Sequence, residues 1–268
     1  MIVEVGGYRL DRRLADGVLG PRYFARTAGG ADVSVELVSV RADEELFERA
    51  LHRITLVATI RHEHLVPIVD AGLDEDVLFM VTPHTDETVD GADAIGLAAG
   101  PIISQVAAGL EHLHGHSIVH RDLQLRHIGI YDGVARLGGF GLSDLASNGR
   151  TDGIGPLGGI LTMAPSIVRG ERATRGSDVY SLGASLHLLA CGRAVHPVRS
   201  ESLTDRIARI GSEPPSIDPS LPAPLYSAVS CALAADSSES TTSAVLASLI
   251  YDIDGTLYRR SARKNDHV

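Results

Sequence analysis

The sequence predicts an α+β fold in two parts, a small β-rich part that carries one helix and a larger, mainly helical part. Three observations support this prediction. Residues 8–38 alternate short apolar runs with turn signals, which is typical of antiparallel strands. Residues 42–60 place apolar side chains at helical spacing. Beyond an acidic connector at 85–96, the apolar residues recur with the period of helices.

The β-rich part is expected to hold strands at 8–14, 23–27 and 33–38, each bounded by turn residues. In the third strand the odd-numbered residues are apolar, whereas Ser34 and Glu36 on the opposite face are polar. After the helix at 42–60, apolar runs at 65–69 and 77–82 predict two further strands of the same sheet.

The second part is expected to be helical, with apolar stripes or runs at 103–113, 179–189, 203–210, 223–234 and 242–251. The two parts are assigned to residues 1–84 and 85–252. Residues 253–268 form a polar, basic tail that is predicted to be disordered.

Composition excludes several classes of function. A formal net charge of -10 disfavours nucleic acid and anionic membranes, which are bound through lysine and arginine. Two scattered cysteines do not form a disulfide framework or a zinc site. The longest apolar stretch, at 95–110, is too short to span a bilayer, and no signal peptide is recognised at the start. We therefore expect a soluble, cytoplasmic protein with no membrane insertion and no partner of nucleic acid.

Four motifs occur in a characteristic order. They are IVHRDL at 118–123, GFGL at 139–142, MAPS at 163–166 and SDVYSLG at 177–183. Together they resemble the eukaryotic-like (Hanks-type) bacterial Ser/Thr protein kinase family, over about residues 8–250. The resemblance implies a protein-kinase-like bilobal fold, with a β-rich N-lobe and a helical C-lobe.

The resemblance also assigns roles to single residues. Asp122 matches the general base of the catalytic loop, and we expect it to be retained for local hydrogen bonding rather than for catalysis. His120 and Phe140 match an internal hydrophobic spine, and Asp178 matches the residue that hydrogen-bonds the catalytic-loop backbone. The nucleotide cleft is expected at Ala15, Gly17, Gly20, Arg22, Ser34, Val81 and His84.

Five positions depart from the family's chemistry. They are Glu36 for the phosphate-binding lysine, Arg53 for its glutamate partner, Gln124 for the catalytic-loop lysine, and His127 and Gly139 for the two magnesium ligands. Phosphoryl transfer relies on cations placed against the phosphates, and magnesium prefers oxygen ligands. The only lysine in the chain is Lys264, in the tail. Glu36 and Arg53 look like a reversed pair, and we predict a salt bridge between them.

Other departures lie in the activation segment. Gly159 stands where the family places a threonine that steadies the catalytic aspartate, and Ser166 and Ser240 replace a buried ion pair of the family. Candidate phosphate acceptors are Ser143, Ser147, Thr151 and Thr162.

A run of alternating histidines at 112–116 suggests a metal site at first sight. Residues two apart do not share a helix face, so no metal site is predicted there.

The leading hypothesis is a pseudokinase, a catalytically silent kinase-like module that acts as a signalling scaffold. Its partner would be a protein, such as a true kinase or a phosphothreonine-binding domain, and no cofactor is expected. One alternative is an active Ser/Thr kinase that uses ATP and magnesium, with Arg22 or Arg53 in place of the lysine. Another is a nucleotide sensor that binds without metal. Oligomeric state does not follow from the sequence.

Overall fold

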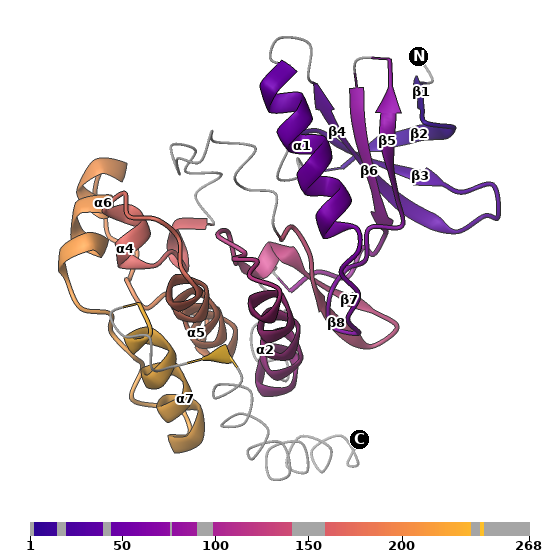
Figure 1. The fold of residues 1–268 in the computed structure, drawn as a ribbon. Coiled ribbons are helices and arrows are strands. Elements are labelled where there is room, and N and C mark those ends of the chain that lie inside the picture. Colours follow the sequence, from indigo (N-terminus) through magenta and orange to yellow (C-terminus); the bar gives the residue numbers. More distant parts are fainter. Residues whose placement is uncertain are drawn as a thin grey trace, which may run out of the picture.

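The fold has two lobes, a sheet with one helix and a group of helices, as predicted (Figure 1). A computed structural model describes residues 3–14, 20–39, 44–75, 77–89, 99–140, 159–236 and 242–243. The predicted tail at 253–268 and most of the helix at 242–251 lie outside these residues.

The sheet lobe is built from one antiparallel sheet and helix α1 (Glu44–Val57). Its strands are β1 (Val3–Val5), β2 (Tyr8–Arg13), β3 (Arg22–Arg26), β4 (Asp32–Ser39), β5 (Asp70–Asp74) and β6 (Val77–Pro83). The spatial order is β1-β2-β3-β4-β6-β5. The side chains of β4 alternate as predicted. Val33 and Val35 enter an apolar cluster, while Ser34 and Glu36 face a cleft.

One predicted strand is wrong. Residues 65–69 form no strand, and Leu65 makes only an isolated bridge to Leu137 of the helical lobe. Pro67 interrupts this run and has no N–H for a sheet ladder, so strand β5 begins only at Asp70. Leu65, Val66 and Ile68 are buried core residues of an irregular loop, whereas Val69 is 52% exposed.

The helical lobe also contains a small hairpin that the sequence did not predict. The hairpin is formed by β7 (Ile128–Tyr131) and β8 (Val134–Leu137). The other elements of the lobe are α2 (Ala99–Gly115), the 3-10 turn η2 (Leu125–His127), η3 (Gly159–Leu161), α4 (Pro165–Val168), α5 (Arg175–Cys191), α6 (Leu203–Ser212) and α7 (Ala223–Ala234). Helix α5 begins with a capping box between Thr174 and Ser177 and ends at Gly192, whose φ of 70° suits glycine.

One hydrophobic cluster runs through both lobes. It joins Ile54 and Val57 of α1 to Leu65, and continues through α2, α5 and α7. Because α1 shares this core with the helical lobe, the helix is held against the cleft by packing. Among the described helices, none is long and apolar enough to cross a membrane.

The contact between α5 and α7 gives a direct test of the packing. A Cβ added to Gly183 would lie 2.4 Å from the Cβ of Ala232. We expect Gly183→Ala to lower the free energy of unfolding by about 1–3 kcal/mol, because the two helices must move apart. Urea denaturation measures the change. Gly115→Ala is the matched control, since an added Cβ there meets no atom within 4 Å, and a small stabilisation of up to about 1 kcal/mol is expected. Equal losses in the two variants would contradict the prediction.

Candidate functional site

A cleft of about 270 Å³ lies between the sheet and the β7–β8 hairpin. Its volume is close to the lower end of the ~300–1,000 Å³ typical of small-molecule pockets. The lining residues are Arg22, Ser34, Glu36, Val57, Val66, Ile68, Met80, Thr82, Pro83, His84, Thr85, Thr88, Arg126, His127, Gly129, Tyr131, Gly138, Gly139 and Phe140. Both lobes therefore contribute walls.

Several predicted cleft residues line this space. Ser34 Oγ lies 2.9 Å from His84 Nδ1, so these two side chains are joined by a hydrogen bond. Gly20 is not among the lining residues. It packs against β4, where an added Cβ would come within 2.3 Å of the carbonyl oxygen of Leu37. Ala15 and Gly17 lie outside the described residues.

The prediction that Val81 lines the cleft is wrong. Val81 pairs with Val35 across the strands, and both are fully buried in the apolar cluster on the other face of the sheet. Side chains alternate along a strand, so the neighbouring Met80 and Thr82 face the cleft instead.

Arg22 brings a positive charge into the cleft. Its Nε is buried and makes no hydrogen bond. Burial raises the pKa of Tyr131, and the charges of Arg22 and Arg136 oppose that rise, which places Arg22 near the β7–β8 hairpin. The cleft is thus lined by two arginines, Arg22 and Arg126, beside the carboxylate of Glu36. The lost lysine does not leave the cleft without positive charge.

Glu36 occupies the predicted position on β4 and is 6% exposed. On α1, Arg53 lies close enough to Arg121 for its charge to matter. Burial lowers the pKa of Arg121, and the charge of Arg53 lowers it further. The predicted bridge between Glu36 and Arg53 stays a prediction.

The carboxylate of Asp122 is held by its own loop. Gln124 Nε2 donates to one carboxylate oxygen at 2.5 Å, and a guanidinium nitrogen of Arg126 lies 3.3 Å from the other. The ring of His127 lies beside the carboxylate oxygen that Arg126 contacts, with its Nε2 at 3.8 Å from that oxygen. Sequence comparison with the family missed Arg126, although its spacing of four residues from Asp122 was a signal. Each oxygen of the Asp122 carboxylate thus has one donor from its own loop.

Gln124 and Gly159 depend on each other. A Cβ at position 159 would lie 3.2 Å from Gln124 Nε2 and 3.3 Å from its Oε1. The side chain of Gln124, which is 4% exposed, therefore fills the space that a side chain at 159 would need. The two departures from the family pattern form one packed unit beside Asp122.

The positions of the two family magnesium ligands do not fit a hard cation. Burial lowers the pKa of His127 to about 4, so its ring is neutral at pH 7. His127 Nδ1 donates to the carbonyl oxygen of Asp122 at 2.7 Å, and the ring stacks on His120. Gly139 has no side chain and a φ of 74°. In the described part of the chain, no three His, Cys, Asp or Glu side chains are grouped to hold a metal ion. Neutral imidazole is a poor magnesium ligand.

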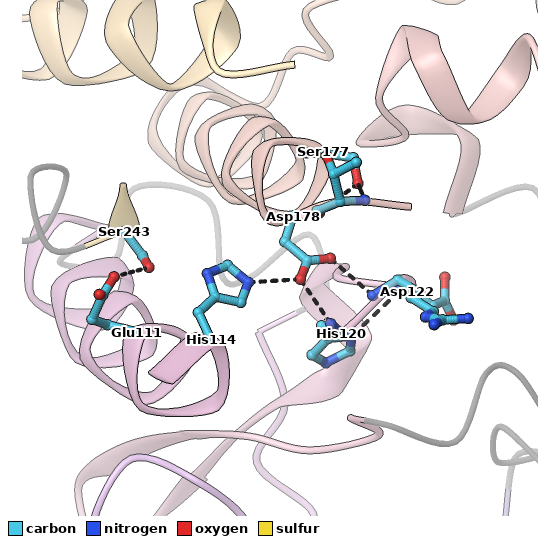
Figure 2. Close-up of polar contacts among 9 residues, drawn as sticks. Glu111, His114, His120, Asp122, Ser177, Asp178 and Ser243 are labelled. Carbon is cyan, nitrogen blue, oxygen red and sulfur yellow. Dashed lines mark hydrogen bonds and ion pairs between the residues drawn. The ribbon is translucent and has the colours of Figure 1, made fainter. Parts of the chain in front are cut away.

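Asp178 organises the backbone behind this loop (Figure 2). Its carboxylate accepts hydrogen bonds from the backbone N–H of His120 at 2.7 Å and of Arg121 at 2.8 Å. His114 Nε2 lies 2.9 Å from the same carboxylate. His120 Nε2 also reaches the carbonyl oxygen of Gly138, which joins the loop to the segment before Gly139. The structure thus places Asp178 in the contact that the resemblance implies.

Phe140 is buried in the main core, 3% exposed, and also borders the cleft. An apolar side chain buried between the core and the cleft is consistent with the spine position that the resemblance implies for Phe140.

Ser166 has a partner that the sequence did not reveal. Its backbone N–H donates to Asp236 at 2.9 Å, and its hydroxyl donates to the same carboxylate. The buried ion pair of the family is thus replaced by hydrogen bonds to Asp236. Ser240 lies outside the described residues.

Of the candidate phosphate acceptors, only Thr162 falls on described residues. Its side chain is 2% exposed and donates to the carbonyl oxygen of Leu123. Because Thr162 is buried, the structure contradicts its assignment as an acceptor. Ser143, Ser147 and Thr151 lie outside the described residues.

Comparison with known proteins agrees with this architecture. A family model described as "Protein kinase domain" matches residues 8–245. The probable serine/threonine-protein kinase PkwA of Thermomonospora curvata is 30% identical over 233 residues, which cover 82% of this chain and 30% of that protein. The DNA damage-responsive serine/threonine-protein kinase RqkA of Deinococcus radiodurans is 29% identical, over 70% of this chain and 30% of that protein.

The serine/threonine-protein kinase AfsK of Streptomyces griseus is 26% identical, over 80% of this chain and 28% of that protein. The chain thus matches less than a third of the length of each of these relatives. The match to the family model covers most of the chain. With the two lobes, the cleft and the loop around Asp122 in place, the chain belongs to the protein kinase domain family.

Proposed function

We propose that this protein is a pseudokinase, a cytoplasmic kinase-like module that transfers no phosphate and acts by binding a protein partner. The observation that carries the proposal is the state of Asp122, whose two carboxylate oxygens are held by Gln124 and Arg126. Glu36 does not supply the cation, and His127 and Gly139 do not supply the side-chain oxygen ligands, that phosphoryl transfer uses at these positions. The two free cysteines suit a reducing compartment.

A phosphotransfer assay tests catalytic silence. The full chain is incubated with radiolabelled ATP, with magnesium or manganese, and with a generic Ser/Thr substrate. Asp122→Asn serves as the matched control, since it keeps the shape of the side chain and removes the base. We expect both proteins to give the same background. Transfer by the natural chain that disappears in Asp122→Asn would overturn the proposal.

Because a generic substrate can be the wrong one, nucleotide binding is measured as well. Thermal unfolding with ATP and magnesium at saturating concentration should leave the midpoint unchanged. A ligand at 100 times its dissociation constant would add about 2.7 kcal/mol of stability. A shift that requires magnesium would contradict the pseudokinase proposal and favour the active kinase.

A second candidate is a nucleotide sensor that binds without metal. One observation favours it, namely the buried Arg22 Nε without a hydrogen-bond partner in a cleft that also holds Arg126. Arginine binds phosphate well and needs no metal to do so. The thermal experiment separates the two candidates, because a metal-free sensor shifts with ATP in excess EDTA and loses the shift in Arg22→Met. Pure scaffolding predicts no shift in either protein.

A further inference from the structure

Four histidines from two segments meet on one side of the molecule. His62 and His64 lie in the loop between α1 and β5. His112 lies in the last turn of α2, and His116 follows the end of that helix. The ring centroids of His112 and His116 are 4.5 Å apart, those of His62 and His112 are 4.9 Å apart, and those of His62 and His64 are 5.6 Å apart. We refer to these four residues as the histidine cluster. The sequence suggested only His112 and His116, because the loop that brings the other two is distant in sequence.

Two hydrogen bonds fix which ring nitrogens carry protons. The backbone N–H of His64 donates to His62 Nδ1 at 3.1 Å, so the lone pair of His62 is on Nδ1. His116 Nδ1 lies 2.8 Å from the carbonyl oxygen of His112 and must be the donor. A second proton on His62 would have to occupy Nδ1. That proton would replace an acceptor with a donor facing the N–H of His64, and the hydrogen bond would be lost.

The loop that holds His62 is tied directly to the floor of the cleft. The N–H of Leu137 donates to the carbonyl oxygen of His64, and the N–H of Val66 donates to the carbonyl oxygen of Leu137. Leu137 is followed at once by Gly138 and Gly139, which line the cleft. A change in the hydrogen bonding of His62 can therefore move the cleft-lining residues Gly138 and Gly139 through Leu137.

The charges around the histidine cluster give protonation little support. Glu63 lies 3.6 Å from His64 but is mostly exposed, and Glu111 on α2 receives a hydrogen bond from Ser243. Arg61 turns to the carbonyl oxygens of its own loop. From β8, Arg136 lies over the ring of Tyr131. Burial lowers the pKa of His62, the neighbouring His112 and His64 lower it further, and the charge of Glu63 opposes this shift.

We propose that the histidine cluster is a proton-sensitive latch that ties the loop after α1 to α2 and β8. When His62 is neutral, its Nδ1 accepts the hydrogen bond from the backbone N–H of His64. A second proton on His62 turns Nδ1 into a donor, so that hydrogen bond is lost and the loop is released. The cleft and the docking of α1 then respond to mild acid, whether or not the protein transfers phosphate.

Hydrogen exchange of single amides in the whole chain tests the latch. The protection factors of Val66 and Leu137 are measured by NMR at pH 7.5 and pH 5, with amides of α5 as the reference for global unfolding. We expect protection at the two loop amides to fall about five- to tenfold, which corresponds to the loss of one hydrogen bond. The α5 amides should change less.

His62→Asn is the decisive variant. Asparagine can accept from the N–H two residues on, as in an Asx turn, but does not titrate. In His62→Asn, protection of the two loop amides should be the same at pH 7.5 and pH 5. His52→Asn is the control at an exposed histidine of α1, and in that variant protection should fall at pH 5 as it does in the natural chain. Unchanged protection in the natural chain would overturn the proposal. So would an equal loss in His62→Asn, because the acid effect would then arise elsewhere.

Discussion

Replacing Asp178 by alanine is expected to lower the free energy of unfolding by about 3–5 kcal/mol. The carboxylate is 1% exposed and serves three donors, the backbone N–H groups of His120 and Arg121 and the ring of His114. Each buried donor left without an acceptor costs about 1–3 kcal/mol, and water entering the vacated space recovers part of that sum. Urea or guanidinium denaturation at pH 7.5 measures the change.

Two variants sharpen this prediction. Asp178→Asn keeps the volume but turns one acceptor into a donor that faces an N–H, so an intermediate loss is expected. Ser185→Ala is the matched control on the same helix, because the Ser185 hydroxyl is buried and has no hydrogen-bond partner. Its removal should be neutral or slightly stabilising. A loss below about 1 kcal/mol in Asp178→Ala would show that the network does not hold the loop.

The Asp178 network supports the shape of the loop independently of the side chains that differ from the family pattern. Asp178 accepts hydrogen bonds from the backbone of residues 120 and 121, whereas His127 and Gly139 line the cleft and Gln124 donates to the carboxylate of Asp122. The fold of the loop and its reactive groups are thus supported by different residues. Loss of the reactive groups leaves the supporting hydrogen bonds intact.

Much of the fold followed from the sequence because short-range patterns determine it. The alternation of β4 predicted that Ser34 and Glu36 share a face, and helical periodicity located α2, α5 and α7. The run at 65–69 failed, since apolar residues of an irregular buried loop have the same composition as a strand. The hairpin β7–β8 was missed because its four-residue strands are too short for a periodic signal.

The site was predictable only where each residue could be considered alone. Substitution at 36, 127 and 139 is visible in the sequence. The pairing of Gln124 with Gly159 depends on contacts across 35 positions, and the bond from Ser166 to Asp236 spans 70. The error at Val81 has the same origin, since one step along a strand changes the face that a side chain occupies.

Acidification from pH 7 to pH 4 is expected to remove about 3 kcal/mol of stability through His127 alone. The pKa of the ring in the folded protein is about 4, because of burial, and its ordinary value is 6.5. Between these values the unfolded chain binds a proton that the folded chain does not. The stabilisation is therefore complete above about pH 7, is lost as the pH falls through 6.5, and has declined by about 2 kcal/mol at pH 5.

Denaturation measured at several pH values tests this with His127→Asn. Asparagine can still donate to the carbonyl oxygen of Asp122 and does not titrate. The free energy of unfolding of the variant should therefore be closer to that of the natural chain above pH 7 than at pH 5. The slope that remains belongs to His62, His187 and His196, whose pKa values are also lowered by burial. The exposed His52 gives the matched control, because His52→Asn should leave the pH profile unchanged. If His127→Asn keeps the full acid slope, the ring of His127 is not the buried neutral group inferred here, and its stacking on His120 leaves room for a proton.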